Sequence, residues 1–373
     1  MIFLPIFLWF CMMGNMAKSF DFPIFKTKID GEERKFSLED PASRRKYFDA
    51  KAGPEIEKIR GYLQNNTFVG FLLGKKNSGK GTYSKLFMEA VGKEHMAHIS
   101  VGDIVRSVHD DLADSTKKEE LIVFLRRRYR GFIAVEQALD VITGRDTKTL
   151  LPTEVILALV EREIGKLEHK AIFVDGFPRN LDQVSYALFF RAIIGYRDDP
   201  DFFVFIDVPE TVIDERMKYR VVCPICHVPR STKLLRTKDI EYDAESKEFH
   251  LLCDNPECKG TRMVAKEGDE LGIEAIRDRI EVDGEIMGML SGLNGVPKVH
   301  LRNAIPVTAA KEYVDDYEIT PSYRYEWDEQ TRQVRVIEEP WIVKDEKGVE
   351  SYSLLPAAVV VSLIKQIVAA LGL

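Results

Sequence analysis

Apolar runs alternate with amphipathic stretches through the central part of the chain. Four runs rich in β-branched and aromatic residues have the length of buried strands, at 67–73, 95–100, 170–175 and 201–208. Polar, helix-forming sequence follows each of them. Strands that alternate with helices predict a parallel sheet covered by helices on both faces, so the fold class is α/β. Catalytic groups are then expected at the carboxyl ends of the strands.

The same pattern predicts the elements around this core. We expect a helix at 55–64, a long helix at 274–290, a strand at 298–303 and a helix at 306–317. Between 318 and 353, turn sequences separate alternating segments, which predicts β-hairpins. The last stretch begins at Pro356 and has a strongly apolar helical face. Because Lys365 and Gln366 interrupt this face, a helix packed on the core is favoured over a membrane anchor.

Two segments break the alternation of strands and helices. The first, 107–152, is charged and helical in pattern, and we interpret its basic run Arg126–Arg128 as the solvated face of a helix. The second, 221–266, holds four of the five cysteines. The core is therefore expected to be interrupted twice.

The N-terminus is apolar for about a dozen residues, but it lacks a basic n-region and is short for a membrane span. Three interpretations stay open: a weak signal or anchor, an arm packed on the body, or sequence upstream of a true start at Met16. The whole chain has 373 residues, enough for a large core and two or more lobes. Its net charge of −7 gives no general attraction to nucleic acid or to an anionic membrane.

The sequence GKKNSGKGT, residues 74–82, directly follows the first predicted strand and leads into a helical run. Its three glycines surround Lys80 and let the backbone curl tightly, because glycine accepts positive φ values. Successive N–H groups that curl into a helix N-terminus form a cradle for anions. The stretch fits the pattern G-x-x-x-x-G-K and predicts a nucleotide phosphate site.

Four cysteines form two close pairs in the second inserted segment, at Cys223, Cys226, Cys253 and Cys258. Two such knuckles predict a tetrahedral Cys₄ zinc site, which is structural because no position is open for a substrate. His227 directly follows the first knuckle and is an alternative for one ligand. Disulfides are the other alternative and are disfavoured in a reducing cytoplasm. Because the flanking sequence carries both signs of charge, no nucleic-acid surface is expected there.

Five motifs follow one another in the chain: GKKNSGKGT, ISVGDIVR, LLPTEVILALVERE, VDGFPRNLDQ and DERMKYR. Together they resemble the adenylate kinase family of nucleoside monophosphate (NMP) kinases, over about residues 67–310. The resemblance implies a P-loop kinase core with a parallel sheet covered by helices, a mobile NMP-binding segment and a zinc-ribbon lid. The predicted C-terminal β-hairpins are an addition to the common family pattern.

The resemblance also divides the chain into segments. We expect an N-terminal extension at 1–55, core with the phosphate loop at 56–106, the NMP-binding segment at 107–170, core at 171–220, the zinc lid at 221–268, and core with a C-terminal extension at 269–373.

Phosphoryl transfer works mostly by positioning and charge neutralisation, so several cations must converge on the phosphates. The resemblance implies catalytic roles for Lys80, Arg179, Arg216, Arg220 and Arg279. It implies ATP binding by Gly74, Ser78, Gly79, Lys80, Gly81, Thr82 and Arg216. It implies AMP binding by Val101, Arg106, Pro152, Gly176, Arg179 and Gln183. Asp175 is a candidate outer-sphere Mg²⁺ ligand, and Asp103 either shares that role or caps a helix.

The sequence departs from the family pattern at three places. Asn77 replaces a usual glycine of the loop, and asparagine tolerates left-handed backbone better than most residues. Val101 stands where adenine-specific members commonly have threonine, so one hydrogen bond to the base is lost. The usual lid arginine before two acids is not clearly present, since KEGDE at 266–270 is displaced by about a residue. The resemblance therefore assigns no phosphate-binding arginine to this part of the lid.

Taken with its residues, the resemblance predicts an adenylate kinase that transfers a phosphoryl group reversibly from ATP–Mg to AMP, giving two ADP. Gln183 is expected to select adenine, because its amide offers both an acceptor and donors. The alternatives are a UMP/CMP or GMP kinase of the same fold and a catalytically weak nucleotide-binding regulatory protein. We expect a cytoplasmic monomer whose partners are ATP and AMP, without nucleic acid or membrane, and whose cofactors are Mg²⁺ with ATP and a structural Zn²⁺.

Overall fold

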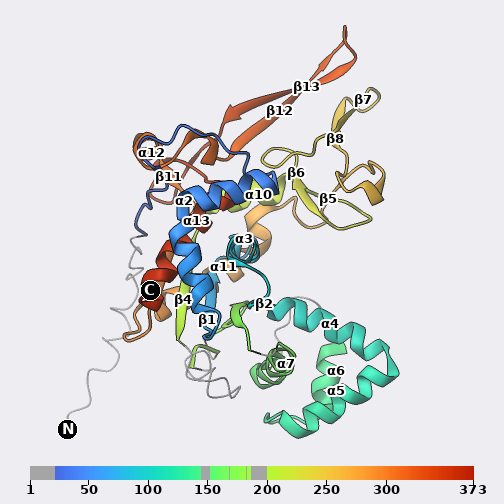
Figure 1. Cartoon of the computed structure of the whole chain (residues 1–373). Helices are drawn as coiled ribbons and strands as arrows, with labels where there is room; N and C mark the ends of the chain where they lie inside the picture. The colour runs from blue at the N-terminus through green and yellow to red at the C-terminus, as the bar shows by residue number, and fades with distance from the viewer. Residues whose placement is uncertain (1–21, 144–151, 168, 182, 186–199) are drawn as a thin grey trace, which may run out of the picture.

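The structure is a computed structural model, and it describes residues 22–143, 152–167, 169–181, 183–185 and 200–373. Its centre is a parallel five-stranded sheet with the strand order β10-β4-β1-β3-β2 (Figure 1). The strands are β1 (Val69–Gly74), β2 (Met96–Ser100), β3 (Ala171–Asp175), β4 (Asp201–Asp207) and β10 (Lys298–Arg302). All five strands that the hydrophobic pattern predicts are therefore confirmed, to within one or two residues at each end.

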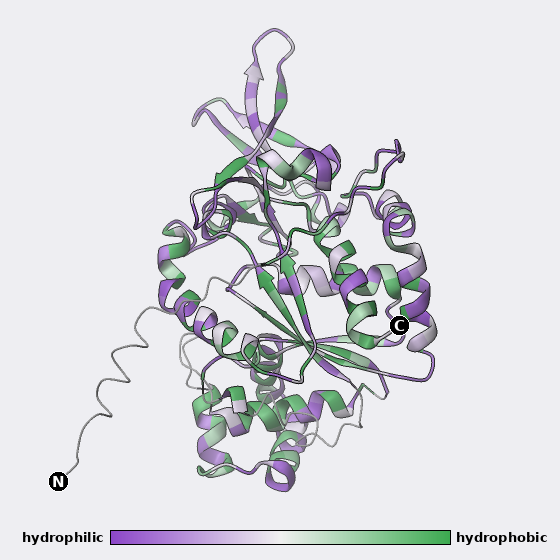
Figure 2. Ribbon diagram, turned by 90° about the vertical axis from the view of Figure 1, so that its left-hand side faces the viewer, coloured by the Kyte–Doolittle hydropathy of each residue, from purple (hydrophilic) through white to green (hydrophobic). Residues whose placement is uncertain are grey.

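The central strand β1 is buried at every position, because β3 and β4 flank it and helices cover both faces of the sheet. Alternate residues of β4 face opposite layers: Val204 and Ile206 belong to one hydrophobic core, and Phe203 and Phe205 belong to the other. The sheet is accordingly the most hydrophobic part of the fold (Figure 2).

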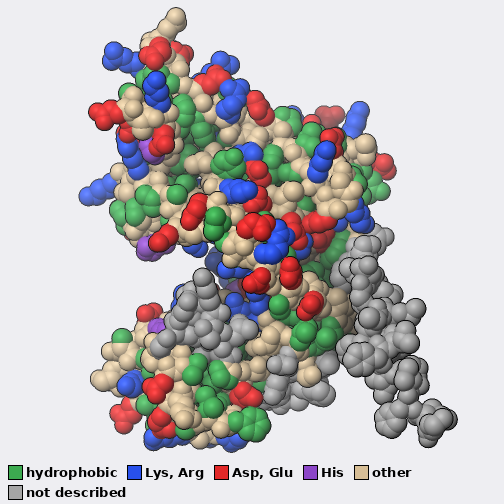
Figure 3. Space-filling view, turned by 180° about the vertical axis from the view of Figure 1, so that it is seen from behind, with side chains coloured by type: hydrophobic (Ala, Val, Ile, Leu, Met, Phe, Trp, Pro, Cys, Tyr) green, Lys and Arg blue, Asp and Glu red, His purple; other side chains and the backbone are tan. Residues whose placement is uncertain are grey.

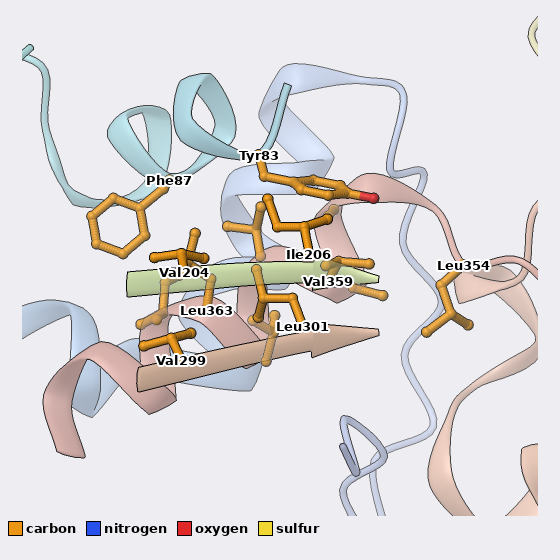
Figure 4. Packing of buried hydrophobic residues seen from close by; sticks show 14 of the residues in the cluster. Tyr83, Phe87, Val204, Ile206, Val299, Leu301, Leu354, Val359 and Leu363 are labelled. Carbon is orange, nitrogen blue, oxygen red and sulfur yellow. The ribbon is translucent and has the colours of Figure 1, made fainter. Parts of the chain in front are cut away.

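One face of the sheet is covered by α2 (Pro41–Tyr62), α3 (Lys80–Val91) and α13 (Pro356–Leu371). Figure 4 shows Val359 and Leu363 of α13 packed against the residues of β4 and β10 on this face. The prediction that the final helix packs on the core is thus confirmed. Among the residues that the structure describes, no helix has both the length and the apolar character needed to cross a membrane.

The helix expected at 55–64 begins earlier in the chain than predicted. It begins at Pro41, where Asp40 accepts a hydrogen bond from the Ser43 amide and proline occupies the first turn. Its backbone departs from helical geometry at Ala52, so two shorter helices are joined across a kink. Only one face of this helix packs on the core, so most of its residues are polar. The hydrophobic pattern therefore did not predict that the helix begins at Pro41.

On the opposite face of the sheet, α11 (Arg277–Ser291) contacts β1, and the hydrophobic core of that face continues into four helices that pack mainly on one another. The four helices are α4 (Val101–Ala113), α5 (Ser115–Arg128), α6 (Val135–Thr143) and α7 (Thr153–Gly165). The basic run at the end of α5 is solvated as interpreted, because Arg126 pairs with Glu136 and Arg128 with Glu161 on the exposed surface.

The inserted segment with the cysteines folds into short antiparallel strands, which we call the cysteine module (residues 220–265). Its strands are β5 (Arg220–Val222), β6 (Pro229–Ser231), β7 (Ile240–Asp243), β8 (Glu248–Leu251) and β9 (Val264–Ala265). The module follows α10 (Glu210–Lys218) and returns to α11 through a 3₁₀ turn, Gly272–Ile276. It lies at the end of the molecule away from α5 and α6 (Figure 1).

The C-terminal hairpins are confirmed. The strands β12 (Pro321–Asp328) and β13 (Gln333–Pro340) pair along their whole length, and we call them the long hairpin. A second sheet has the order β11-β15-β14, from Ile305–Pro306, Glu350–Tyr352 and Ile342–Lys344. The helix expected at 306–317 is shorter than predicted, since α12 spans only Val307–Tyr313 and a 3₁₀ turn follows at Asp316–Glu318.

Candidate functional site

The loop between β1 and α3 curls as its glycine content predicts. Asn77 has φ 65° and Gly79 has φ 96°, so both occupy the left-handed region. Asparagine at position 77 therefore keeps the curl, as the sequence led us to expect. Gly74 is required for another reason: a Cβ atom there would lie 2.8 Å from both the Ile206 carbonyl oxygen and the Ser78 hydroxyl.

The side chain of Lys80 lies inside this curl. Its Nζ donates hydrogen bonds to the carbonyl oxygens of Gly74 at 2.8 Å and Lys75 at 3.1 Å. Burial lowers the pKa of Lys80, and the charges of Asp175 and Asp283 partly oppose that shift. Gly81 and Thr82 follow in the first turn of α3, where the Thr82 side chain is exposed.

The loop opens onto a cavity of about 240 Å³ at the carboxyl ends of β1, β2 and β3. Its polar wall is formed by Lys76, Asn77, Lys80, Ser100, Arg106, Asp175, Arg179, Arg279 and Asp283. Figure 3 shows lysine and arginine side chains gathered in the hollow between the two parts of the molecule. The structure thus brings together Lys80, Arg106, Arg179 and Arg279, which lie far apart in the sequence.

Arg279 and Asp283 connect α11 to the two loops around the cavity. The guanidinium of Arg279 donates to the Arg179 carbonyl oxygen at 2.6 Å and pairs with Asp283 at 2.7 Å. The other Asp283 oxygen accepts the Lys76 amide at 2.9 Å. Burial raises the pKa of Asp283, and the charges of Arg279 and Lys80 oppose the shift. Arg277 instead pairs outside the cavity, with Glu210 at 2.9 Å.

Several buried polar atoms at this site have no hydrogen-bond partner among the described residues. Four of the five such side-chain atoms in that part of the chain are Asn77 Nδ2, Ser78 Oγ, Arg179 Nε and Gln183 Nε2. Each unsatisfied buried group costs on the order of 1–3 kcal/mol, so natural proteins rarely gather them in one place. Asn77 and Arg179 line the cavity, and Ser78 and Gln183 belong to the loops next to it, which indicates that a polar ligand completes the site.

The two candidate magnesium-associated acids differ in their surroundings. Asp175 lies at the end of β3, lines the cavity, and raises the pKa of Lys80 through its charge. Asp103 is exposed and pairs with Arg106, and its backbone amide bonds the Ser100 hydroxyl that caps α4. Of the two acids, only Asp175 lines the cavity, whereas Asp103 is engaged by Arg106.

Three of the residues predicted to bind AMP, namely Val101, Gly176 and Gln183, lie at the loop after β3. Gly176 has φ 82°, and a Cβ atom there would meet Val101 at 3.7 Å. Gln183 is completely buried, and its Oε1 accepts the Arg179 amide at 2.7 Å. Its amide nitrogen has no partner among the described residues, so it can donate a hydrogen bond to a ligand. Pro152 immediately precedes α7.

Arg216 and Arg220, at the entry to the cysteine module, lie outside the wall of the cavity as the described residues form it. Arg220 makes two hydrogen bonds to Asp269, at 2.5 and 2.7 Å. Arg216 is half-buried and has no hydrogen-bond or ion-pair partner in the described part of the chain. The structure therefore unites four of the predicted cations in the cavity and leaves these two beside it.

The four cysteines of the module form one cluster, with sulfur atoms all within 4.8 Å of one another. Tetrahedral zinc with Zn–S bonds of about 2.3 Å requires sulfurs about 3.8 Å apart, and the Cys226 and Cys253 sulfurs are 3.6 Å apart. The thiols are free, and backbone N–H groups lower the pKa of Cys223 to about 6. His227 is exposed and outside the cluster. The donor set and its spacing fit a structural zinc ion, without an imidazole ligand.

No family model matches the chain. Among curated proteins it is similar to "Probable UMP-CMP kinase 2" of Arabidopsis thaliana, 28% identical over 52% of this chain and 64% of the relative. It is similar to "Adenylate kinase" of Hydrogenobaculum, 29% identical over 57% of this chain and 80% of the relative. "Adenylate kinase 1" of Synechocystis is 32% identical, over 40% of this chain and 65% of the relative. The chain thus spans just under two thirds of the length of two of these relatives.

The relatives that the chain resembles are thus adenylate kinases and UMP-CMP kinases, which act on nucleoside monophosphates. This similarity agrees with the α/β core, whose parallel sheet carries the phosphate loop after its central strand.

Sequence reasoning missed two residues that the structure places at the cavity. Asp283 lies four residues after Arg279 on the same helix, a spacing that marks an ion pair and was a usable signal. Lys76 lies within the phosphate loop itself, where we had considered only Lys80 as a cation.

The long hairpin packs on the cysteine module. Three aromatic residues alternate along β12 and contact the module from one face of the strand, namely Tyr323, Tyr325 and Trp327. The Tyr325 hydroxyl donates to the Thr232 carbonyl oxygen at 2.7 Å. The Trp327 ring stacks on Tyr242 with centroids 4.7 Å apart. The alternation Y-x-Y-x-W was visible in the sequence, but its partner surface was not.

Proposed function

We propose that this protein transfers the terminal phosphoryl group of ATP, bound with Mg²⁺, to a nucleoside monophosphate, and that AMP is the preferred acceptor. The observation that carries the proposal is the convergence of Lys80, Arg106, Arg179 and Arg279 on one cavity, whose wall also holds unsatisfied buried polar atoms of Asn77 and Arg179. Phosphoryl transfer needs such positioned positive charge and little else from the protein.

Each group has a role that its position supports. Lys80, now held by two loop carbonyls, releases them to follow the transferring phosphoryl group. Arg106 and Arg179 grip the acceptor phosphate, since a guanidinium matches two phosphate oxygens. Arg279, fixed by Asp283, neutralises charge between donor and acceptor. Asp175 would hold Mg²⁺ through water, and the bound ion would neutralise the donor phosphates.

We propose that Arg216 and Arg220, which lie beside the cavity, bind the phosphates of ATP from the side of the cysteine module. Arg216 has a free guanidinium in the described structure, and Arg220 is held by Asp269 until phosphate competes for it. The loop residues Gly74, Ser78, Gly79, Gly81 and Thr82 supply backbone and hydroxyl donors to the same phosphates. A zinc ion on the four cysteines would keep the module folded and would take no part in the transfer.

Preference for AMP rests on Gln183. Its acceptor atom is occupied by the Arg179 amide, so the donor side of the amide is available to a base. Against adenine stands Val101, which cannot form the bond that a threonine would. The related proteins named UMP-CMP kinases make a pyrimidine monophosphate the second candidate acceptor.

The test compares kcat/KM for AMP, CMP, UMP and GMP with ATP–Mg as donor. We expect AMP to be used best by the unmodified protein. In Gln183→Glu the acceptor for the Arg179 amide is kept while the free donor is lost, so the preference for AMP should fall about tenfold. If a pyrimidine monophosphate or GMP is used better than AMP by the unmodified protein, the assignment to AMP is wrong and the broader kinase assignment stands.

A further inference from the structure

A second cavity lies between the cysteine module and the long hairpin, and we call it the hairpin cleft. Its volume is about 800 Å³, which is within the range of small-molecule sites. Strands β5, β8 and β9 of the module form one side of the cleft, and residues 322–325 of β12 form the other. Among the described residues, none that lines the hairpin cleft also lines the cavity around Lys80. The cleft is therefore separate from the site of the proposed function.

Aromatic side chains give the hairpin cleft flat apolar walls, and the contacts around them hold the rings in place. The Tyr325 hydroxyl donates to the Thr232 carbonyl oxygen at 2.7 Å, and Phe249 packs against the Tyr325 ring with centroids 5.8 Å apart. Burial raises the pKa of both Tyr323 and Tyr325 to about 12, so their hydroxyls stay neutral. Rings that are already fixed lose little conformational freedom when a ligand stacks on them. The aromatic residues of the wall are Tyr219, Phe249, Tyr323 and Tyr325.

The lysine, arginine and carboxylate side chains in the described wall balance one another. Lys233 pairs with Glu215, which lies outside the wall, and Arg324 pairs with Glu339 at 3.4 Å. Glu248 is the second carboxylate of the wall, so two acids stand against two basic side chains. An ion that entered the cleft would lose its hydration without gaining an unpaired countercharge, so the cleft favours an uncharged molecule.

Apolar surface is left open at the edge of the hairpin cleft, because Val264 is 48% exposed and Tyr219 is 40% exposed. We propose that the hairpin cleft binds an uncharged, planar aromatic or heteroaromatic molecule, which stacks on the rings of the wall and covers these two side chains. His250 in the same wall offers a hydrogen bond to a polar edge of such a molecule. The bound molecule would bridge the long hairpin and the cysteine module. This inference does not rest on the proposed function.

The experiment uses indole as an uncharged aromatic probe and indoleacetate as its charged counterpart, with the full-length chain. A ligand-observed NMR titration should show saturable binding of indole, and indoleacetate should bind about tenfold more weakly. Bound indole should slow the hydrogen exchange of amides in β8 and β12 and leave β1 unchanged.

Two variants place the probe in the cleft. Val264→Asp brings a carboxylate to its edge and should weaken indole binding about tenfold. Tyr219→Leu removes a ring but keeps an apolar side chain, and should weaken binding about fivefold. Leu235→Asp is the matched control, because Leu235 is 39% exposed in the same module but does not line the cleft, and its affinity for indole should be unchanged. Exchange of β5 amides without the probe checks that the module stays folded in each variant.

Absence of saturable indole binding would overturn the proposal, and so would equal affinity for indoleacetate. Unchanged affinity in both Val264→Asp and Tyr219→Leu would put the probe outside the hairpin cleft, with the same consequence. If Val264→Asp unfolds the module, Tyr219→Leu alone decides. Failure of the phosphoryl-transfer assay would refute the proposed function and leave this inference standing, since the two sites share no wall residue among those described.

Discussion

The contact between the long hairpin and the cysteine module gives a prediction on the stability of the module. Tyr325→Phe removes the hydroxyl that donates to Thr232, and Trp327→Ala removes the ring stacked on Tyr242. Both changes leave the cysteines and the loop around Lys80 untouched. The double variant should open the module more often while the core sheet keeps its stability.

The magnitude follows from the two contacts. A hydrogen bond is worth about 1 kcal/mol net, and a stacked aromatic pair contributes about 0.5–1.5 kcal/mol beyond its buried area. Their sum, about 2 kcal/mol, corresponds to a roughly thirtyfold larger opening equilibrium.

Hydrogen exchange of backbone amides measures this equilibrium for each region separately. We expect amides of β7 and β8 to exchange about thirtyfold faster in the double variant, with β1 unchanged. Arg335→Ala is the control, because it alters an exposed residue on the same hairpin. Unchanged exchange in β7 and β8 would refute the reasoning and would mean that the cysteine cluster alone holds the module.

Three further predictions concern the cysteines, the pH profile and the ion pair on α11. Protein purified without chelator should contain one zinc per chain by elemental analysis, and serine at all four cysteine positions should abolish binding and unfold the module. Because burial lowers the pKa of Lys80, kcat should fall as pH rises through a value below the ordinary 10.5, and a flat profile up to that pH would contradict this role. Asp283→Ala leaves Arg279 unpaired and should lower the free energy of unfolding by about 2 kcal/mol in urea titrations, with Asp278→Ala as an exposed control on the same helix.

The sequence predicted best those features that depend on local pattern. Buried strands are continuous apolar runs, so all five core strands were found. The curl of the loop was found too, because few residues besides glycine and asparagine accept the φ values at Asn77 and Gly79. The order of motifs along a parallel sheet also implied that Arg106 and Arg179 meet at neighbouring strand ends.

Features that depend on distant partners could not be predicted. The start of α2 at Pro41 follows from a face that packs on the core, which a polar sequence hides. The ion pair between Lys75 and Glu346 joins residues 271 positions apart in the chain. The docking of β12 on the cysteine module requires a surface that exists only after both have folded.

The most direct test of the account is the formation of ADP from ATP–Mg and AMP by the purified protein, followed by separation of the nucleotides. We predict two ADP for each ATP consumed. We also predict almost no ADP with Lys80→Ala, whose fold should persist because only one half-buried side chain is truncated. Absence of transfer to AMP or to any other monophosphate by the unmodified protein, or near-normal turnover by Lys80→Ala, would contradict the central claim.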